Sequence, residues 1–320
     1  MPEPVSDSGN RLLVISADYR AYLELLRPQA PKDLPIRGCD SLQDGRRQAR
    51  SCNIILGDPN LVAGVLEHAD RLQWVQSSFA GVDALCRPGL RRDYQLTGVK
   101  HIFGPLISEY VFAYVLALER HLFEARRRQA QRRWQSTPYR SLRGQTLGVA
   151  GFGSIGRHLA QTGRHFDMDV VAYKRSPGTS ELARRVFSGS EFADFLGGLD
   201  YLVLALPKTP ETDYLIDAAA LRLMQRDAVV INVGRGSTLV ERDLQQALET
   251  GRIRAAVLDV FEREPLSADS PLWGLPNVFV TPHVAAVSFV PDIVRIFFDN
   301  YRRFVAGGSL SDRIDFQRGY

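Results

Sequence analysis

Three side chains in the second half of the chain have the chemistry to bind and protonate a small anionic substrate. Arg235 lies between two glycines after an apolar run, where a guanidinium could make a planar, forked contact with a carboxylate. His283 follows a later apolar run, and a carboxylate in the segment that contains Glu264 could hold the imidazole and keep it charged. Taken singly, these residues also allow a solvated arginine in a turn and a structural histidine.

The motif Gly151-x-Gly153-x-x-Gly156 has the spacing of a dinucleotide-binding turn. It follows an apolar segment at 146–150, opens a helical pattern and precedes a second apolar segment at 169–173, which is the context that this motif requires. Gly151 would permit the tight turn, Gly153 would let the backbone approach a pyrophosphate, and Gly156 would let the helix pack closely. The N-terminus of that helix would direct N–H groups at the phosphates. A turn without a ligand is the alternative.

The residues after the segment 169–173 indicate which dinucleotide is bound. Domains that bind NAD usually place an Asp or Glu there, on the ribose 2′-hydroxyl. This chain has Lys174, Arg175 and Ser176 instead, and no acid. Two cations and a hydroxyl suit a 2′-phosphate, so we expect NADP(H) to be preferred, with NAD(H) as the alternative cofactor. A solvated strand end is the interpretation without a ligand.

The elements that must position these residues are apolar segments of strand length separated by helical spacers. In the second half they occur at 146–150, 169–173, 201–206, 228–233, 255–259 and 277–281. Six such strands match the doubly wound dinucleotide fold, in which ligands lie beyond the carboxyl ends of the strands. That rule directs attention to the residues that follow each strand.

The first part of the chain alternates strands and helices but has no phosphate-binding motif of its own. The expected strands are 12–15, 53–58 and 72–77, and the expected helices are 22–26 and 61–66. Such alternation predicts a parallel α/β layer. We therefore expect this half to bind the substrate.

Two further helices are expected between and after these halves. One runs from about Leu106 through Leu122, and the basic stretch 126–134 continues it. A solvated helix face or a subunit contact explains that stretch better than nucleic acid, since no aromatic interleaving or known motif supports the latter. The other helix, 291–304, is expected to cross back to the first domain.

Composition restricts the class of protein. The 320 residues suggest about two domains, and 45% hydrophobic with 24% charged residues is ordinary for a globular protein. No apolar run approaches the ~20 residues of a membrane span, and the net charge of +4 is too small to argue for nucleic acid. Three cysteines without metal-like spacing, and no secretory pattern in residues 1–7, predict a cytoplasmic protein without a metal.

The chain resembles the D-isomer-specific 2-hydroxyacid dehydrogenases over almost its whole length. The matching segments occur in the family's order: Ser-Ser-Phe-Ala-Gly-Val-Asp at 77–83, the glycine motif, Asn-Val-Gly-Arg-Gly at 232–236, Leu-Asp-Val-Phe-x-x-Glu-Pro-Leu at 258–266, and Thr-Pro-His at 281–283. Several independent matches in register make the resemblance specific. The segments 269–273 and 282–287 are most similar to the NADPH-dependent glyoxylate/hydroxypyruvate reductase branch.

The resemblance implies an α/β protein of two domains with a cleft between them. The doubly wound dinucleotide-binding (Rossmann) domain would be 106–285. The smaller, flavodoxin-like substrate domain would be 1–105 plus 286–320. A homodimer is also implied, with the stretch 126–134 at the interface.

The resemblance also assigns roles in the reduction of a small 2-oxoacid to the D-2-hydroxyacid by hydride transfer from NAD(P)H. Arg235, Glu264 and His283 would be catalytic: His283 protonates the ketone oxygen, Glu264 orients His283, and Arg235 binds the substrate carboxylate. Backbone N–H groups of Ala80 and Gly81 would bind the same carboxylate. Cofactor contacts are expected at Gly151, Phe152, Gly153, Ser154, Ile155, Gly156, Lys174, Arg175, Ser176, Leu206, Pro207, Thr212, Val233, Asp259 (on the nicotinamide carboxamide) and His283.

Two points stay open at this level. A dinucleotide-sensing regulator or corepressor on the same fold would keep the same three catalytic residues, so the sequence does not separate it from an enzyme. The substrate's side chain is also unassigned. Phe79, Trp273 and Phe289 are candidates for its pocket, but such residues are more often core.

Overall fold

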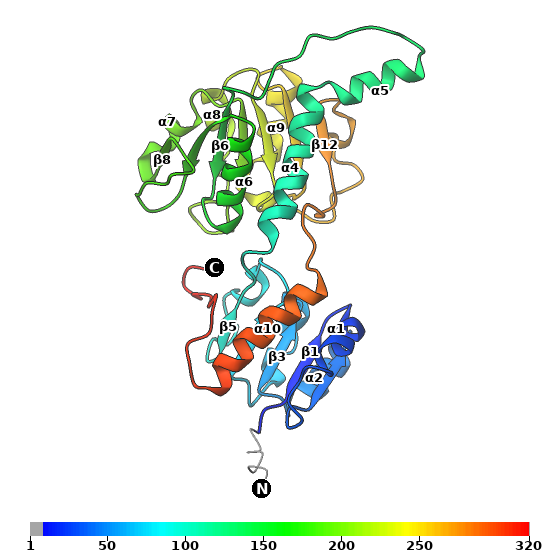
Figure 1. Ribbon diagram of the computed structural model, residues 1–320, viewed down its shortest axis with the longest axis vertical. Coiled ribbons are helices and arrows are strands. Elements are labelled where there is room, and N and C mark those ends of the chain that lie inside the picture. The colour runs from blue at the N-terminus through cyan, green and yellow to red at the C-terminus, as the bar shows by residue number, and fades with distance from the viewer. Residues whose placement is uncertain (1–8, 320) are drawn as a thin grey trace. The chain divides into compact units, whose positions relative to one another are not determined.

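The computed structural model describes residues 9–319. The chain divides into two compact units (Figure 1). The discontinuous unit contains the described residues up to Ile102 together with those from Ser288 on, and the central unit runs from Phe103 to Val287. The expectation about residues 1–7 lies outside the described part of the chain.

The discontinuous unit is built on one sheet of five parallel strands in the order β2-β1-β3-β4-β5, which is the flavodoxin-like order. The strands are β1 (Leu12–Ile15), β2 (Ile36–Cys39), β3 (Ile54–Gly57), β4 (Trp74–Ser77) and β5 (Gln95–Thr97). The helices are α1 (Tyr19–Leu26), α2 (Leu42–Ala49), α3 (Pro59–Ala63) and α10 (Val290–Val305), with 3₁₀ turns η1 (Leu66–His68) and η2 (Asp83–Leu85). All residues of β1, β3 and β4 are buried, as expected for parallel strands covered on both faces.

The last helix, α10, belongs to the discontinuous unit although it follows the central unit in sequence. Pro291 lies in its first turn, where a missing N–H has no cost. The ring of Phe297 stacks on Trp74 of β4 with centroids 5.1 Å apart, and the Trp74 indole N–H donates to Thr97 Oγ1 of β5 at 2.8 Å. The expected return of this helix to the first part of the chain is therefore observed.

The central unit is built on seven parallel strands in the order β12-β11-β10-β9-β6-β7-β8. The strands are β6 (Thr146–Ala150), β7 (Asp169–Tyr173), β8 (Arg185–Phe187), β9 (Tyr201–Leu204), β10 (Val229–Asn232), β11 (Ala255–Leu258) and β12 (Val278–Val280). The helices are α4 (Phe103–Glu119), α5 (Leu122–Ala130), α6 (Ser154–His165), α7 (Phe192–Leu196), α8 (Ala218–Leu223) and α9 (Glu241–Glu249), with 3₁₀ turns η3 (Gly189–Glu191), η4 (Gly236–Thr238) and η5 (Pro271–Gly274). The strand order reverses between β6 and β9, so the predicted doubly wound class is confirmed.

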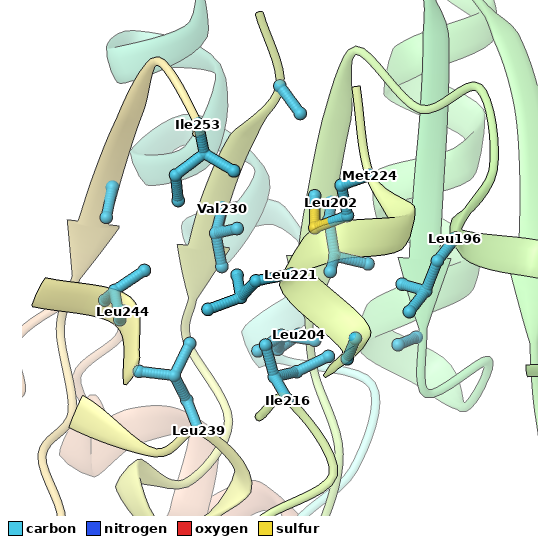
Figure 2. Close-up of a cluster of buried hydrophobic side chains, with 14 of the residues drawn as sticks. Leu196, Leu202, Leu204, Ile216, Leu221, Met224, Val230, Leu239, Leu244 and Ile253 are labelled. Carbon is cyan, nitrogen blue, oxygen red and sulfur yellow. The ribbon is translucent and has the colours of Figure 1, made fainter. Parts of the chain in front are cut away.

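Both faces of this sheet are covered. On one face α6 packs so closely that a Cβ on its Gly163 would lie 2.6 Å from Leu147 of β6. On the other face a continuous apolar cluster joins the strands to α8 and α9 (Figure 2). Leu221 of α8, Leu244 of α9 and Val230 of β10 are all within it. This double covering holds the strands of the sheet whose carboxyl edge carries the predicted cofactor and catalytic residues.

Three strands were not expected from the sequence. They are β2 and β5 in the discontinuous unit and β8 in the central unit, which has seven strands rather than the predicted six. Each of the three is the outermost strand on one side of its sheet. The strands that were expected are all present, with ends that differ by at most a few residues.

The predicted continuous helix from 106 through 122 into the basic stretch is wrong. Helix α4 ends at Glu119, His121 takes a left-handed φ of 51°, and a separate helix α5 ends at Ala130, before Arg132. A left-handed residue cannot continue a right-handed helix, so the chain changes direction there. No helix within residues 9–319 has both the length and the apolar content that crossing a membrane requires.

A buried ionic cluster fastens the end of α4 to the amino ends of the strands. The side chain of Glu119 is 3% exposed and accepts hydrogen bonds from Tyr201 Oη of β9 and from Arg254 Nη2, both at 2.6 Å. Burial alone would raise the pKa of Glu119, but these hydrogen bonds outweigh it and the pKa is lowered. Ionised Glu119 therefore stabilises the fold at a pH above the pKa of an unfolded glutamate. This stabilisation is lost as the pH falls through the lower pKa that Glu119 has in the folded protein.

Replacing Glu119 with Gln should lower the free energy of unfolding by about 2–4 kcal/mol, somewhat below the usual cost of breaking a buried pair because Arg254 is partly exposed. The amide keeps the shape of the side chain but leaves Arg254 without its counter-charge. Urea unfolding at neutral pH measures the change. Glu249→Gln, at an exposed position of α9, is the control. Equal stability of the two variants would contradict the stabilising role of the Glu119 carboxylate.

Candidate active site

The loops of the central unit that contain the predicted functional residues all follow the carboxyl ends of parallel strands. The strand order places β7 and β9 on either side of β6, with β10, β11 and β12 following in turn. Ligands of open α/β sheets bind outside this edge, at the point where the strand order reverses. The residues predicted from these separate loops therefore share one edge of one sheet.

The turn after β6 fits a bound pyrophosphate. Gly151 has a φ of 97°, and a Cβ on it would lie 2.3 Å from Ala205 O in the loop after β9. A Cβ on Gly156 would lie 2.0 Å from Gly151 O, so α6 can approach the strand only with glycine there. A Cβ on Gly153 would meet nothing within 4 Å, which leaves that side of the turn open beside the unpaired first N–H groups of α6. The other predicted contacts here are Phe152, which is buried in the turn, and Ser154 and Ile155, which begin α6.

The three residues predicted to select NADP(H) lie beside this turn, because β7 pairs with β6 in parallel. Lys174 is half-buried, and Arg175 and Ser176 are exposed. In the loop after β9, a hydrogen bond from Thr209 is the main cause that lowers the pKa of Glu211, and the charge of Arg175 makes a smaller contribution in the same direction. The loop after β7, which carries Lys174 and Arg175, and the loop after β9 therefore lie on either side of the glycine turn.

The loop after β9 is closed by a threonine hydroxyl. Thr212 Oγ1 donates to Pro207 O at 2.7 Å and accepts from Thr209 N at 2.9 Å. Its proton is therefore used within the loop, and a contact of Thr212 with the cofactor stays a prediction. The predicted contacts in this neighbourhood are Leu206, Pro207 and Thr212 after β9 and Val233 directly after β10.

The loop after β10 holds Arg235 partly buried. The buried amide of Asn232 donates to Arg235 O at 3.0 Å and accepts from Gly234 N at 3.1 Å, so it fixes the turn. A Cβ on Gly236 would lie 1.8 Å from the backbone carbonyl carbon of Phe261, so the loops after β10 and β11 touch. One guanidinium nitrogen of Arg235 donates to Gly234 O at 2.8 Å. The arginine is thereby anchored next to the loop that carries the predicted carboxylate.

Glu264 and His283 form the pair that the sequence predicted. His283 Nδ1 lies 2.8 Å from Glu264 Oε2, and Glu264 Oε1 accepts from Phe261 N at 3.1 Å. An ionised carboxylate only accepts, so the shared proton belongs to Nδ1 and leaves Nε2 to exchange a proton with a ligand. The side chain of His283 is 54% exposed, so a small molecule can reach it.

Asp259 organises the backbone around His283. It is almost fully buried, and its carboxylate accepts from Thr281 Oγ1 at 2.6 Å, Val284 N at 2.8 Å and Ala285 N at 2.9 Å. Its main-chain oxygen accepts from His283 N at 2.8 Å. Oδ2 receives only one of these bonds and keeps acceptor capacity, and the contact of Asp259 with a carboxamide stays a prediction.

Ala80 and Gly81, the predicted carboxylate donors, belong to the discontinuous unit. They follow β4 in a turn where Ser77 Oγ donates to Phe79 O at 2.7 Å. Within residues 9–319, the N–H groups of Ala80 and Gly81 have no hydrogen-bond acceptor. Two adjacent free donors are what carboxylate binding requires, and their role stays a prediction.

The three apolar residues suggested as pocket walls are not core residues. Phe79, Trp273 and Phe289 are all about half exposed. An exposed aromatic side chain is available for contact with a ligand or a partner, but exposure alone does not decide between them.

Some residues that shape the site were not predicted from the sequence. Thr281 donates to Asp259, Tyr110 bonds the hydroxyl of Thr281, and Asn232 fixes the arginine turn. Thr281 and Asn232 lie within the Thr-Pro-His and Asn-Val-Gly-Arg-Gly motifs, which was the available signal, whereas nothing local distinguishes Tyr110 from other helix residues. In the described part of the chain no group of His, Cys, Asp or Glu is arranged to hold a metal ion.

Comparison with known proteins identifies the family. Residues 112–285 match the model of the D-isomer specific 2-hydroxyacid dehydrogenase, NAD binding domain. A glyoxylate/hydroxypyruvate reductase A from Serratia proteamaculans (strain 568) is 32% identical over 267 residues, which is 80% of this chain and 84% of that protein.

Solved structures agree with this match. A D-isomer specific 2-hydroxyacid dehydrogenase family protein from Aeromonas salmonicida subsp. salmonicida A449 superposes with a TM-score of 0.91 at 44% identity, over 96% of this chain and 99% of that one. An NADPH-dependent glyoxylate/hydroxypyruvate reductase from Sinorhizobium meliloti, solved with NADP and sulfate, gives a TM-score of 0.87 at 28% identity, over 97% of this chain and 100% of that one. The chain belongs to the D-isomer-specific 2-hydroxyacid dehydrogenase family, as its motifs predicted, and is an oxidoreductase with a nicotinamide-dinucleotide-binding domain.

Proposed function

We propose that this enzyme reduces a small 2-oxoacid of the glyoxylate or hydroxypyruvate type to the D-2-hydroxyacid, with NADPH as the preferred reductant. The observation that carries the proposal is the 2.8 Å contact between His283 Nδ1 and Glu264 Oε2, on a sheet edge that also presents Arg235 and the glycine turn. The relatives named glyoxylate/hydroxypyruvate reductase support the substrate class. Because those relatives have enzyme names, the regulator hypothesis is not favoured.

The residues act on the two ends of the substrate. The guanidinium of Arg235 binds the carboxylate and draws electron density from the neighbouring carbonyl. His283 donates the proton on Nε2 to the ketone oxygen, while Glu264 accepts a hydrogen bond from Nδ1–H and so fixes the orientation of the ring. The N–H groups of Ala80 and Gly81 bind the same carboxylate. A nicotinamide held at the carboxyl edge of the central sheet, beside the glycine turn, would supply the hydride that C2 receives, so that hydride and proton together give the alcohol.

A panel of 2-oxoacids tests this function. Glyoxylate, hydroxypyruvate, pyruvate and phenylpyruvate are each supplied with NADPH or NADH, and consumption of the reduced cofactor is followed by absorbance. The highest kcat/KM is expected for glyoxylate or hydroxypyruvate. Turnover of none of the four would refute the proposed function, and a preference for phenylpyruvate would refute the substrate class.

Replacing Glu264 with Gln should lower kcat for reduction by about tenfold, the equivalent of one charge-assisted hydrogen bond. An amide offers Nδ1–H only a neutral acceptor, so His283 is held less firmly in the orientation that directs Nε2 at the ketone oxygen. Steady-state kinetics with glyoxylate and NADPH measures the change. Glu262→Gln is the matched control, because Glu262 is in the same loop but its carboxylate accepts from Glu241 N at 3.0 Å instead. Equal kcat values for both variants would refute the role of Glu264.

The NADPH preference rests on Lys174 and Arg175 beside the glycine turn, and the reductase from Sinorhizobium meliloti, which binds NADP, supports it. Charge-assisted hydrogen bonds to a 2′-phosphate contribute about 1.5–3 kcal/mol each, and about 1.4 kcal/mol corresponds to one decade. We expect NADPH to exceed NADH in kcat/KM by at least about tenfold, less at high salt. Steady-state kinetics with both cofactors measures the ratio.

The double variant Lys174→Asp with Arg175→Ala should reverse that preference, since it restores a ribose acceptor and removes the phosphate contacts. Arg184→Ala is the control. This exposed residue directly precedes β8, and its backbone N–H donates to Val170 O near the start of β7, at the opposite end of that strand from Lys174. Equal efficiency of the unmodified enzyme with both cofactors at low salt would contradict the argument.

A homodimer is part of this proposal, with α5 and the segment after it as the contact. Figure 1 shows this arm reaching away from the sheet of its unit. It exposes Leu122, Phe123, Trp134 and Tyr139, whereas Arg127 and Arg128 are paired with Glu124 within the helix. An apolar surface of this kind suits a second copy better than nucleic acid. A monomer at micromolar concentration by light scattering would refute the dimer.

The cytoplasm is the proposed compartment. All three cysteines are free, and burial raises the pKa of Cys39 to about 11, so this thiol stays protonated. Free cysteines are typical of reducing compartments.

A further inference from the structure

The backbone at His283 is held in a conformation that needs support. His283 has a φ of 56°, in the left-handed region that a residue with a side chain rarely adopts. The adjacent N–H groups of Val284 and Ala285 are both bonded to the carboxylate of Asp259. The position of the imidazole therefore depends on where this buried carboxylate is fixed.

The hydrogen bonds that fix Asp259 have a defined direction. Thr281 Oγ1 lies 2.6 Å from Asp259 Oδ1 and also 2.6 Å from Tyr110 Oη. A threonine hydroxyl has one proton, and an ionised carboxylate can only accept. Thr281 therefore donates to Asp259, and Tyr110 must donate to Thr281.

Tyr110 is well suited to be the fixed end of this chain of bonds. It lies in the middle of α4, and its ring contacts Tyr114 with centroids 5.1 Å apart; the ring of Tyr114 in turn lies 5.6 Å from that of Phe279 on β12. Burial raises the pKa of Tyr110 far above its usual range, so the phenol stays protonated and can donate. The helix thus reaches the strand end from which the His283 segment leaves.

We propose that Tyr110 is a positioning residue that acts through Thr281 and Asp259 to order residues 281–285 and so place His283 for proton donation. The inference rests on the proposed catalytic role of His283. It adds to that function a residue of α4 that would act through its hydrogen bond to Thr281.

The test uses Tyr110→Phe and Thr281→Val, each of which removes one hydroxyl with little change in shape. In the enzyme without cofactor, amide hydrogen exchange of residues 281–285 should accelerate about tenfold, the equivalent of one hydrogen bond to a charged network. With glyoxylate and NADPH, kcat should fall by a similar factor. The KM for glyoxylate should not change, because Arg235 still binds the carboxylate in the proposed mechanism. Thr281→Ser, which keeps the hydroxyl, should restore both exchange and kcat.

Tyr201→Phe is the matched control. It removes a buried phenol hydroxyl from the same unit, but Tyr201 lies at the start of β9 and its hydroxyl donates to Glu119 at the end of α4. It should lower stability without changing exchange at 281–285 or kcat. Unchanged exchange in both Tyr110→Phe and Thr281→Val would overturn the ordering, and faster exchange with unchanged kcat would overturn the catalytic consequence. Failure of the unmodified enzyme to reduce any 2-oxoacid would refute the proposed function while the exchange result still decides the ordering.

Discussion

Replacing His283 with Ala should lower kcat for 2-oxoacid reduction by about 10²–10⁴, the usual contribution of general acid–base catalysis. The loss follows because the ketone oxygen gains negative charge as hydride arrives and would then have to take its proton from water. KM for the oxoacid should change much less, since Arg235 still binds the carboxylate. Initial rates with saturating NADPH, measured across pH, give both constants.

The control separates loss of chemistry from loss of structure. His165→Ala removes an imidazole from the exposed last turn of α6 in the same unit and should leave kcat unchanged. NADPH binding, followed by fluorescence, should be nearly equal in the unmodified enzyme and both variants. A kcat within about threefold of normal in His283→Ala, far below the range expected for a lost general acid, would exclude His283 from that role.

The pairing of His283 with Glu264 could be predicted because each motif lies directly after a strong apolar strand. Strands β11 and β12 are parallel neighbours, so the loops that leave their carboxyl ends necessarily meet. The glycines of the dinucleotide-binding turn were predictable for a similar reason. The lack of space for a side chain at Gly151 and Gly156 arises within that turn and the elements next to it.

The strands that the sequence did not reveal are all at sheet edges. β2 contains Arg37 and Gly38, β5 has three residues, and β8 begins with the exposed Arg185. An edge strand pairs on one side only and is less covered, so it needs no continuous apolar run. Whether an edge segment forms a strand depends on the neighbouring strand with which it pairs, and the local sequence pattern does not show that neighbour.

Tyr110 could not be predicted for a different reason. Its contact with Thr281 joins positions 171 residues apart, and its helix is apolar nearly all round. A hydrophobic pattern gives no face to such a helix, so it does not show which residue meets β12. The break after Glu119 was hidden in the same way, because the apolar pattern continues through Leu122 and Phe123.

Replacing Arg235 with Lys should be nearly as damaging as the loss of His283, with kcat/KM for reduction falling by about 10²–10³. One guanidinium nitrogen already bonds Gly234 O at 2.8 Å, which orients the planar group toward a ligand. A lysine ammonium is a compact charge without that fork, and it cannot both bond the loop and donate two parallel hydrogen bonds to a carboxylate. Losing one or two charge-assisted hydrogen bonds, about 1.5–3 kcal/mol each, gives the expected range at about 1.4 kcal/mol per decade.

The pattern of kinetic constants decides what Arg235 does. In the proposed mechanism Arg235 contacts the substrate both before and during reaction, so KM for the oxoacid should rise and kcat should fall together, while the Kd of NADPH stays unchanged. Arg242→Lys, on the exposed surface of α9, makes the same chemical change away from the loop and should have no effect. A substrate that lacks the carboxylate, such as a simple aldehyde, should be reduced slowly but equally by the unmodified enzyme and Arg235→Lys. If the variant keeps normal kcat/KM for glyoxylate, the carboxylate is bound elsewhere, and the free N–H groups of Ala80 and Gly81 become its principal donors.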